Sequence, residues 1–256
     1  MIGLLGLGEA GAAIAGGLAG EGVLVSAYDA AIADPAGAAV MAERARGIGV
    51  DLVEEAAQLP ERAEVLLALV TGAVAVDAAK AVAPYLTPRH IYLDLNSAAP
   101  ATKQAVAQVI SAAGARMVDG AVMAAVPPRR HRVPILLAGA AAAEAAARLA
   151  PLGFQLEVVG TEPGEASAIK LCRSLLVKGV EALLWECVAV ADAYGATDRV
   201  LAGAGGTLGG ADWRQVAAYL MSRTVAHGPR RAHELLDVAE TARAAGVDPG
   251  ITAAAE

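Results

Sequence analysis

Short apolar runs alternate with helical patterns along the first 160 residues of the chain. Eight of the runs have the length of a buried strand, at 1–5, 22–28, 48–53, 64–70, 90–95, 115–119, 133–137 and 154–159. Apolar residues recur at helical spacing at 12–19, 35–46, 73–82, 100–113 and 140–149. Strands and helices that alternate in this way are typical of a doubly wound sheet. We therefore predict an α/β Rossmann-type domain over residues 1–160, with about eight strands.

The pattern changes at residues 161–164, after which no strand is expected. Residues 165–194 are apolar on most faces and predict one long helix that ends at Gly195. The glycine-rich stretch 203–210 predicts a loop, and helices are expected at 212–223 and 229–245. We therefore predict an all-helical substrate and dimerisation domain over 161–256, which begins with a long interdomain helix. Because that helix is too apolar to stand alone, either the remaining helices or a second subunit must cover it, and we expect a homodimer through the C-terminal helices.

Charge and cysteine usage exclude several classes of partner. The net charge is −7 and no basic block is interleaved with aromatic residues, so nucleic acid is not an expected partner. No apolar run has the roughly 20 residues of a membrane span, and no secretory signal precedes the first strand, so we expect a cytoplasmic protein without a membrane partner. Cys172 and Cys187 form neither a disulfide framework nor a zinc spacing. We expect buried free thiols and no metal site.

The first strand leads into a glycine turn, Gly6-Leu7-Gly8-Glu9-Ala10-Gly11, which fits the pattern G-x-G-x-x-G. Gly6 allows a tight turn, Gly8 lets a pyrophosphate approach the backbone, and Gly11 lets the following helix lie close to its strand. Asp29 ends the second strand, 18 residues past the third glycine, where a carboxylate can hold the ribose hydroxyls of an adenosine. This arrangement predicts a dinucleotide site.

Further candidate residues follow the carboxyl ends of later strands, where a doubly wound sheet binds its cofactor. Val70 and Thr71 end one run, and Asn96 and Ser97 follow another, immediately before a helix that begins near Pro100. We expect Val70, Thr71 and Asn96 to contact the cofactor. Asn96 and Ser97 can also bind a carboxylate or hydroxyl of a substrate, whereas the alternative is that Ser97 is only the N-cap of the helix.

A polar stripe runs along the predicted long helix. Lys170, Ser174, Lys178 and Glu181 follow one another at spacings of four, four and three. A solvated face explains such a stripe. Alternatively, a lysine shielded near the domain junction can lose its proton near neutral pH and act as a general base, which makes Lys170 the candidate.

Four segments in order carry a resemblance to a known family: GLGEAG at 6–11, DLNSAAP at 94–100, DGAVMAAVP at 119–127 and GEASAIKLCRS at 164–174. With these the chain resembles the β-hydroxyacid dehydrogenases, relatives of 3-hydroxyisobutyrate and 6-phosphogluconate dehydrogenases. The resemblance implies that Lys170 is the catalytic lysine, that Ser97 binds substrate, and that the segment with Gly120 and Ala121 holds the substrate carboxylate. It also implies hydride transfer between a nicotinamide and the carbinol carbon of a small anionic substrate.

Two departures from the family's pattern concern the substrate. Ser174 stands where the family usually has asparagine, and residues 122–124 are Val-Met-Ala where many members have a serine and two glycines. RSLLVKGVEAL at 173–183 and VAHGPRRAHELLDVAE at 225–240 resemble a less characterised branch of the family. Ser174 and Lys178 are substrate-binding candidates. His227 shares a helical face with two arginines, which either bind an anionic substrate or form a surface stripe.

The sequence favours NAD as the cofactor, with NADP as the alternative. Asp29 repels a 2′-phosphate, and the first arginine after it is Arg44, beyond the next ten residues. Imine reductases, which share the two-part architecture and use NADPH, are the alternative enzyme class, but they generally lack the catalytic lysine. A non-catalytic dinucleotide-binding protein is the alternative outside enzymes. The segment 129–132, Arg-Arg-His-Arg, is expected to be a solvated loop.

Overall fold

The computed structural model describes residues 1–255, except for the side chains of residues 227, 229–231 and 233. The chain forms two compact units, Met1–Lys170 and Leu171–Glu256. The predicted boundary near residue 160 remains a prediction.

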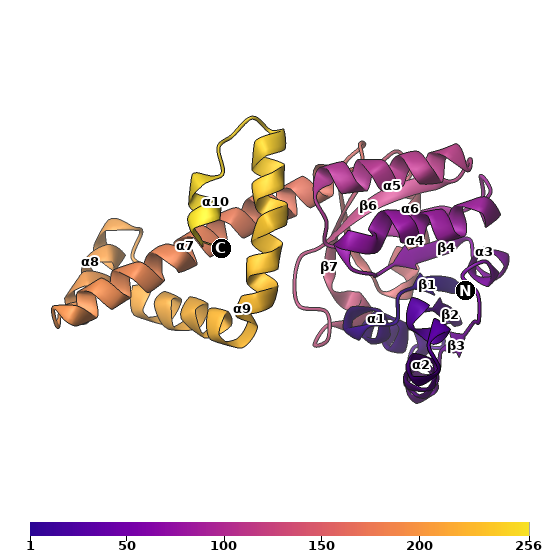
Figure 1. Cartoon of the computed structure of the whole chain (residues 1–256), viewed down its shortest axis with the longest axis horizontal. Coiled ribbons are helices and arrows are strands. Elements are labelled where there is room, and N and C mark those ends of the chain that lie inside the picture. Colours follow the sequence, from indigo (N-terminus) through magenta and orange to yellow (C-terminus); the bar gives the residue numbers. More distant parts are fainter. Residues whose placement is uncertain (256) are drawn as a thin grey trace. The chain divides into compact units, whose positions relative to one another are not determined.

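The first unit contains one eight-stranded sheet, which confirms the predicted fold class (Figure 1). Its strands are β1 (Ile2–Leu5), β2 (Val25–Tyr28), β3 (Asp51–Leu52), β4 (Val65–Ala68), β5 (Ile91–Asp94), β6 (Arg116–Val122), β7 (Pro134–Ala138) and β8 (Gln155–Gly160). They lie in the order β3-β2-β1-β4-β5-β6-β7-β8. The first six strands are parallel, so their carboxyl ends meet at one edge of the sheet, where such folds bind ligands.

The strand β6 extends beyond its predicted end at residue 119. It continues to Val122 because it pairs antiparallel with β7, in a register that sets Asp119 against Ala138 and Val122 against Ile135. Gly120 and Ala121 therefore lie inside the sheet rather than beyond the strand. A Cβ at Gly120 would overlap the side chains of the neighbouring strand β5, which explains why the residue has none.

Two hydrophobic cores lie on the two faces of this sheet. One face is covered by α1 (Glu9–Ala19), α2 (Pro35–Ile48) and α6 (Ala142–Leu149), and the other by α3 (Gln58–Arg62), α4 (Ala75–Val82) and α5 (Pro100–Ala112). Because successive side chains of a strand point to opposite faces, Leu4 packs in the first core and Leu5 in the second. Short 3-10 helices complete the unit: η1 (Ala30–Ala33), η2 (Gly72–Val74), η3 (Ala83–Tyr85), η4 (Arg130–Arg132) and η5 (Ala150–Leu152).

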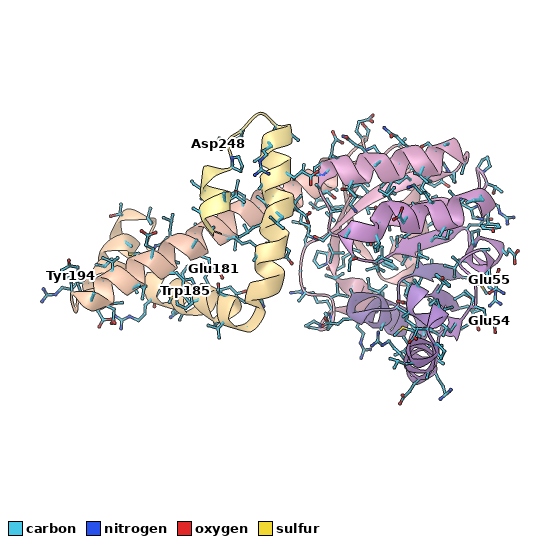
Figure 2. The ribbon with its side chains drawn as sticks, viewed as in Figure 1. Glu54, Glu55, Glu181, Trp185, Tyr194 and Asp248 are labelled. Carbon is cyan, nitrogen blue, oxygen red and sulfur yellow. The ribbon has the colours of Figure 1, made fainter. Side chains whose placement is uncertain are left out.

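The described part of the chain after residue 165 is helical. It contains α7 (Glu165–Ala193), which begins in the first unit, and then α8 (Thr197–Thr207), α9 (Trp213–Ala244) and α10 (Gly250–Ala255). A small core in the second unit joins Leu184 of α7 to Leu201 of α8 and Leu220 of α9. Tyr194, which follows α7, is 83% exposed and extends outward (Figure 2). Among the helices described, none combines the length and hydropathy that a bilayer-spanning segment needs.

Three predictions for the second unit were wrong. The stretch 203–210 is largely helical, because α8 buries Leu201 and Gly205 despite its glycines. The two helices expected at 212–223 and 229–245 are one helix, α9, which contains Pro229 and changes direction along its length (Figure 1). The two cysteines are exposed free thiols rather than buried ones.

Candidate active site

The glycine turn between β1 and α1 has the geometry that its sequence predicts. Gly6 has φ +98°, and a Cβ there would overlap the carbonyl of Leu69. A Cβ at Gly11 would overlap the carbonyl of Gly6, so this glycine allows the helix to lie against the turn. Gly8 is the N-cap of α1 without a side-chain cap, and a Cβ there would meet nothing within 4 Å. The space over Gly8, at the start of α1, is thus open to an anion, which fits a bound pyrophosphate.

Two oppositely charged side chains hold Leu7, the second residue of the turn. The Leu7 N–H donates to Asp29 Oδ2 at 2.7 Å, and the Ala31 N–H donates to Asp29 Oδ1 at 2.9 Å. Arg44 Nη1 of α2 donates to the Leu7 carbonyl at 2.7 Å. Arg44 was not predicted as a site residue, because 37 residues separate it from Leu7 and local spacing carries no signal for their contact.

The ends of β4 and β5 are joined through Asn96. The Val70 N–H donates to Asn96 Oδ1 at 2.7 Å, and Asn96 is 2% exposed. Its Nδ2 is buried and has no hydrogen-bond partner within the described residues. Thr71 precedes η2, and a Cβ at Gly72 would approach the Ser97 carbonyl within 2.5 Å. The structure therefore brings the predicted residues Val70, Thr71 and Asn96 to one edge of the sheet.

Lys170 and Ser97, which are 73 residues apart in the chain, lie in contact. Lys170 Nζ donates to Ser97 Oγ at 3.1 Å, and both side chains are half-buried. The alternative that Ser97 caps α5 is wrong, because the N-cap of α5 is Ala99 and makes no side-chain cap. The contact places an amine beside a hydroxyl at the carboxyl end of β5.

A buried ion cluster lies behind these two residues. Lys103 of α5, with no exposed side-chain surface, donates to Asp94 Oδ1 at 3.0 Å and lies 3.4 Å from Asp119 Oδ1. Asp119 Oδ2 accepts the Gly164 and Ser167 N–H groups at 3.0 Å each, and Asp119 Oδ1 accepts the Ser167 hydroxyl at 2.7 Å. The cluster thus joins the strand that precedes Ser97 to the helix turn that precedes Lys170.

This cluster was not predicted from the sequence, although the pattern of α5 indicates a charged residue in the core. Lys103, Val106 and Ile110 follow at spacings of three and four, so Lys103 occupies a core position of an apolar helix face. A charged residue at a core position indicates a buried partner of opposite charge.

Tyr92 lies in the same core. Burial raises the pKa of its hydroxyl, and the Asp94 carboxylate raises that pKa further, so the Tyr92 hydroxyl stays neutral.

The other predicted substrate residues lie in different surroundings. Gly120 and Ala121 are buried in β6, where they pair with Leu137 and Leu136. Ser174 is half-buried on α7. Lys178 is 6% exposed and pairs with Glu234 of α9 at 2.7 Å, so this part of the stripe is not a solvated face. The side chain of His227 lies outside the described residues.

The segment 129–132 is only partly solvated, contrary to prediction. His131 is 1% exposed and packs edge-on against Phe154, with ring centroids 5.8 Å apart. Burial lowers the pKa of His131, against the opposing effect of Glu21. Arg132 is exposed and donates to Glu21 at 2.6 Å, which lowers the pKa of Glu21. The segment therefore anchors β7 and β8 to the end of α1.

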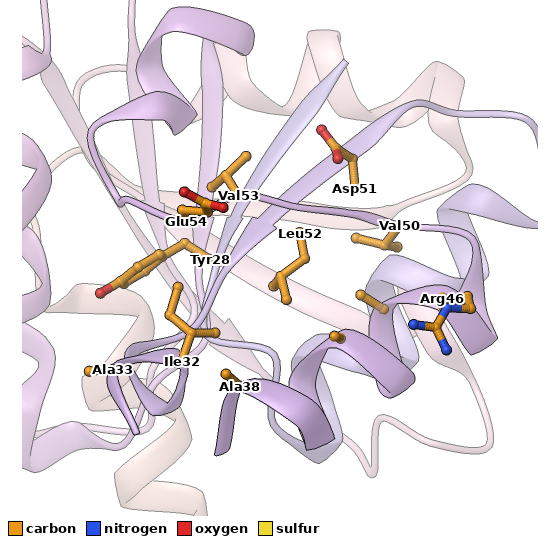
Figure 3. Close-up of a pocket in the computed structure, with 12 residues that line it drawn as sticks. Tyr28, Ile32, Ala33, Ala38, Arg46, Val50, Asp51, Leu52, Val53 and Glu54 are labelled. Atoms are coloured by element: carbon orange, nitrogen blue, oxygen red, sulfur yellow. The ribbon is translucent and has the colours of Figure 1, made fainter. Parts of the chain in front are cut away.

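A cavity of about 740 Å³ lies between α2 and the sheet edge at β3. Tyr28 and Arg46 lie at opposite ends of it (Figure 3). Its lining is mainly apolar, and it includes neither Ser97 nor Lys170. The cavity is therefore separate from the contact between these two residues.

Comparison with known proteins agrees with this geometry. Residues 1–160 match the family model described as the NAD binding domain of 6-phosphogluconate dehydrogenase. The chain belongs to this family. Residues 191–256 match a second model, described as a domain of unknown function (DUF1932). The resemblance to β-hydroxyacid dehydrogenases is therefore confirmed, in a branch whose C-terminal domain has no assigned function, and the cofactor is NAD(P).

Solved structures share the whole fold. A conserved hypothetical protein from Sinorhizobium meliloti 1021 is 43% identical, with a TM-score of 0.89 over 99% of this chain and 85% of its own. A conserved protein of unknown function, described as structurally similar to 3-hydroxyacid dehydrogenases, is 31% identical, with a TM-score of 0.83 over 99% and 95%. The Mycobacterium tuberculosis 3-hydroxyisobutyrate dehydrogenase shares the fold at 18% identity, with a TM-score of 0.81 over 99% and 90%.

A curated relative matches only part of the chain. It is an uncharacterized 28.5 kDa protein of Methanothermus fervidus, 29% identical over 157 residues. The match covers 61% of this chain and 59% of the relative.

Within the described residues, no group of three or more His, Cys, Asp or Glu side chains could hold a metal ion.

Proposed function

We propose that this protein is an NAD(P)-dependent dehydrogenase or reductase that acts on the CH–OH group of a small acid-bearing substrate, with Lys170 as the general acid and base. The observation that supports it is the 3.1 Å contact between Lys170 Nζ and Ser97 Oγ. The contact lies at the sheet edge where Val70, Thr71 and Asn96 meet, in a domain of a family that binds NAD. A general base must reach the proton that it abstracts, and a substrate hydroxyl held by Ser97 would lie beside the Lys170 amine.

A nicotinamide, when bound, would accept a hydride from the carbinol carbon of the substrate or return one to the carbonyl carbon. During oxidation, Lys170 Nζ would take the proton of the substrate hydroxyl, whose oxygen becomes the carbonyl oxygen. During reduction, Lys170 gives the proton back to the carbonyl oxygen. Ser97 Oγ accepts a hydrogen bond from Lys170 and can donate its own proton to the substrate oxygen, which orients that oxygen toward the amine.

The buried cluster behind the site supports this assignment. Asp119 holds Gly164 and Ser167, and Ser167 lies one helical turn before Lys170. Lys103 bonds to Asp94 at the end of β5, three residues before Ser97. Each partner of the Lys170–Ser97 contact is thus attached to one buried network, which restricts how far the two can separate. By the resemblance, imine reductases generally lack the lysine, so Lys170 favours the hydroxyacid chemistry.

The first experiment is a titration with NADH and NADPH, followed by a turnover screen of 3-hydroxy acids that includes 3-hydroxyisobutyrate and L-serine. We expect Lys170→Met to bind cofactor within about twofold of wild type and to lose about 10²–10⁴-fold in kcat, the usual range for a positioned acid or base. Lys80→Met is the matched control, because Lys80 is exposed on α4. Equal turnover by Lys170→Met, or turnover of imines without hydroxy acids, would contradict the proposal.

A further inference from the structure

Arg44 comes to the cofactor turn from the middle of α2. Arg44 Nη1 donates to the Leu7 carbonyl at 2.7 Å. The Leu7 N–H donates to Asp29 Oδ2, also at 2.7 Å. An anion and a cation therefore hold the two peptide groups that flank Leu7, Asp29 at its N–H and Arg44 at its carbonyl. Arg44 is far from Asp29 along the chain, which favours NAD on sequence alone, but the fold brings both side chains to Leu7.

The charges of Asp29 and Arg44 act on the same region. Both side chains contact Leu7, so their charged groups lie within about one Debye length of each other, roughly 8–10 Å. Each oxygen of Asp29 already accepts a backbone N–H, which holds the carboxylate in place. The repulsion that Asp29 exerts on a 2′-phosphate is therefore opposed by a guanidinium at the same turn.

Arg44 also has the donors that a phosphate requires. A guanidinium carries five N–H donors, and one of them bonds to Leu7. Arg44 takes part in none of the ion pairs of the described residues. Its side chain is half-buried, so an anion bound there is partly shielded from water and salt. The planar fork of an arginine suits the oxygens of a phosphate group.

We propose that Arg44 is a specificity-determining residue that binds the 2′-phosphate of NADPH and lets the chain use this cofactor despite Asp29. The inference rests on the cofactor of the proposed function and does not depend on the substrate or on Lys170. It assigns to α2 a part in cofactor choice, which the loop directly after β2 does not supply here, because residues 30–35 are Ala-Ala-Ile-Ala-Asp-Pro.

The test is direct binding, followed by nicotinamide fluorescence with NADH and with NADPH in the full chain. We expect Arg44→Gln to weaken NADPH binding by about tenfold or more, the range of one charge-assisted hydrogen bond, and NADH binding by less than about threefold. Arg44→Lys keeps the charge without the fork and should fall between wild type and Arg44→Gln. Arg46→Gln is the matched control, because Arg46 is exposed two residues further along the same helix.

Equal weakening of NADH and NADPH by Arg44→Gln would overturn the proposal, since it would mean that Arg44 only braces the turn or contacts the part common to both cofactors. A wild-type protein that binds NADH and not NADPH would overturn it as well. Competition by adenosine 2′,5′-bisphosphate, with and without Arg44, isolates the 2′-phosphate from the nicotinamide half. Loss of hydroxyacid turnover with this binding pattern intact would count against the proposed reaction alone.

Discussion

At the scale of the residue, Gly8 and Gly11 belong to one turn and yet face different surroundings. A methyl group at Gly11 would overlap the Gly6 carbonyl, whereas one at Gly8 would enter open space. We expect Gly11→Ala to lower the melting temperature of the protein, and Gly8→Ala to melt as wild type does but to bind NADH at least about tenfold more weakly, because the methyl group occupies the approach of the pyrophosphate. Thermal melts and fluorescence titrations separate the two effects. Normal cofactor binding by Gly8→Ala would count against the pyrophosphate site.

Replacing Lys103 should lower the free energy of unfolding, because its ammonium group pairs with two buried carboxylates. Lys103→Met leaves the buried carboxylates of Asp94 and Asp119 without their cation, and breaking a buried pair on one side typically costs about 3–5 kcal/mol. We expect a large drop in the denaturant midpoint. Lys80→Met is the control, since the pair of Lys80 with Asp77 is exposed and should contribute little. Similar midpoints for the two variants would mean that the cluster does not stabilise the fold.

At the scale of the element, we expect the contact between α1 and η4 to depend on pH, because η4 contains the buried His131. Burial lowers the pKa of His131 in the folded protein, whereas the same side chain in the unfolded chain keeps its ordinary pKa of about 6.5. Below that pH the unfolded chain therefore binds a proton that the folded protein does not, which favours unfolding. The stability is therefore complete above about pH 6.5 and is lost as the pH falls toward the lowered pKa. We expect the melting temperature to fall between pH 7.5 and 5.5, and to fall less in His131→Gln. Parallel curves for the two proteins would exclude His131 as the cause.

The helix α8 carries glycines of two kinds. Gly203 and Gly206 have open space at the Cβ position, whereas a Cβ at Gly205 would lie 2.8 Å from the Ala211 carbonyl. Alanine at either open position should stabilise the protein by about 0.5–1 kcal/mol, because glycine loses the most backbone freedom on folding. Gly205→Ala should destabilise it. Denaturant unfolding of the three variants measures the difference in the free energy of unfolding. If neither Gly203→Ala nor Gly206→Ala raises that free energy, the backbone freedom of these glycines does not limit the stability of α8.

Local patterns were enough for the eight strands and the longer helices of the first unit, whereas the five-residue helix α3 was not predicted. A strand or helix shows its own period in the sequence, so each of the eight strands was predicted to within a few residues. The helix α8 was missed because its stability comes from burying Leu201 against its neighbours, which overrides the preference of its glycines for a loop. The extension of β6 was missed because it depends on pairing with β7.

At the scale of the whole molecule, one face of α7 is left exposed by the residues that the structure describes. Leu176, Leu183 and Val190 recur at seven-residue spacing and are 68%, 63% and 56% exposed. Such a row lies on one side of a helix and suits a partner helix, which supports the proposed homodimer. We expect light scattering to give twice the 25.5 kDa of one chain, and Leu183→Lys to give the monomer. Leu24→Lys, at a 67% exposed position of the first unit, is the control; a monomeric wild type would contradict the proposal.

Long-range contacts set the limit of what the sequence could predict about the site. The glycine turn and Asp29 were predictable because their spacing is local. Ser97 and Lys170 could be paired only through the resemblance to a family, since they are 73 positions apart in the chain. Arg44 and Lys103 belong to no motif. Their importance arises from partners 37 and 9 residues away, which only the fold brings into reach.

The hydrogen bonds from the start of α7 to Asp119 determine where the chain can be shortened without exposing a buried carboxylate. The family model ends at residue 160, but two backbone N–H groups and one hydroxyl from Gly164 and Ser167 satisfy the buried carboxylate of Asp119. A fragment that stops at 160 would leave this carboxylate in the core with Lys103 as its remaining partner. A fragment that keeps the first turn of α7, through Lys170, retains every donor. We therefore expect the smallest fragment that folds alone to extend about ten residues beyond the family model, from residue 160 to Lys170.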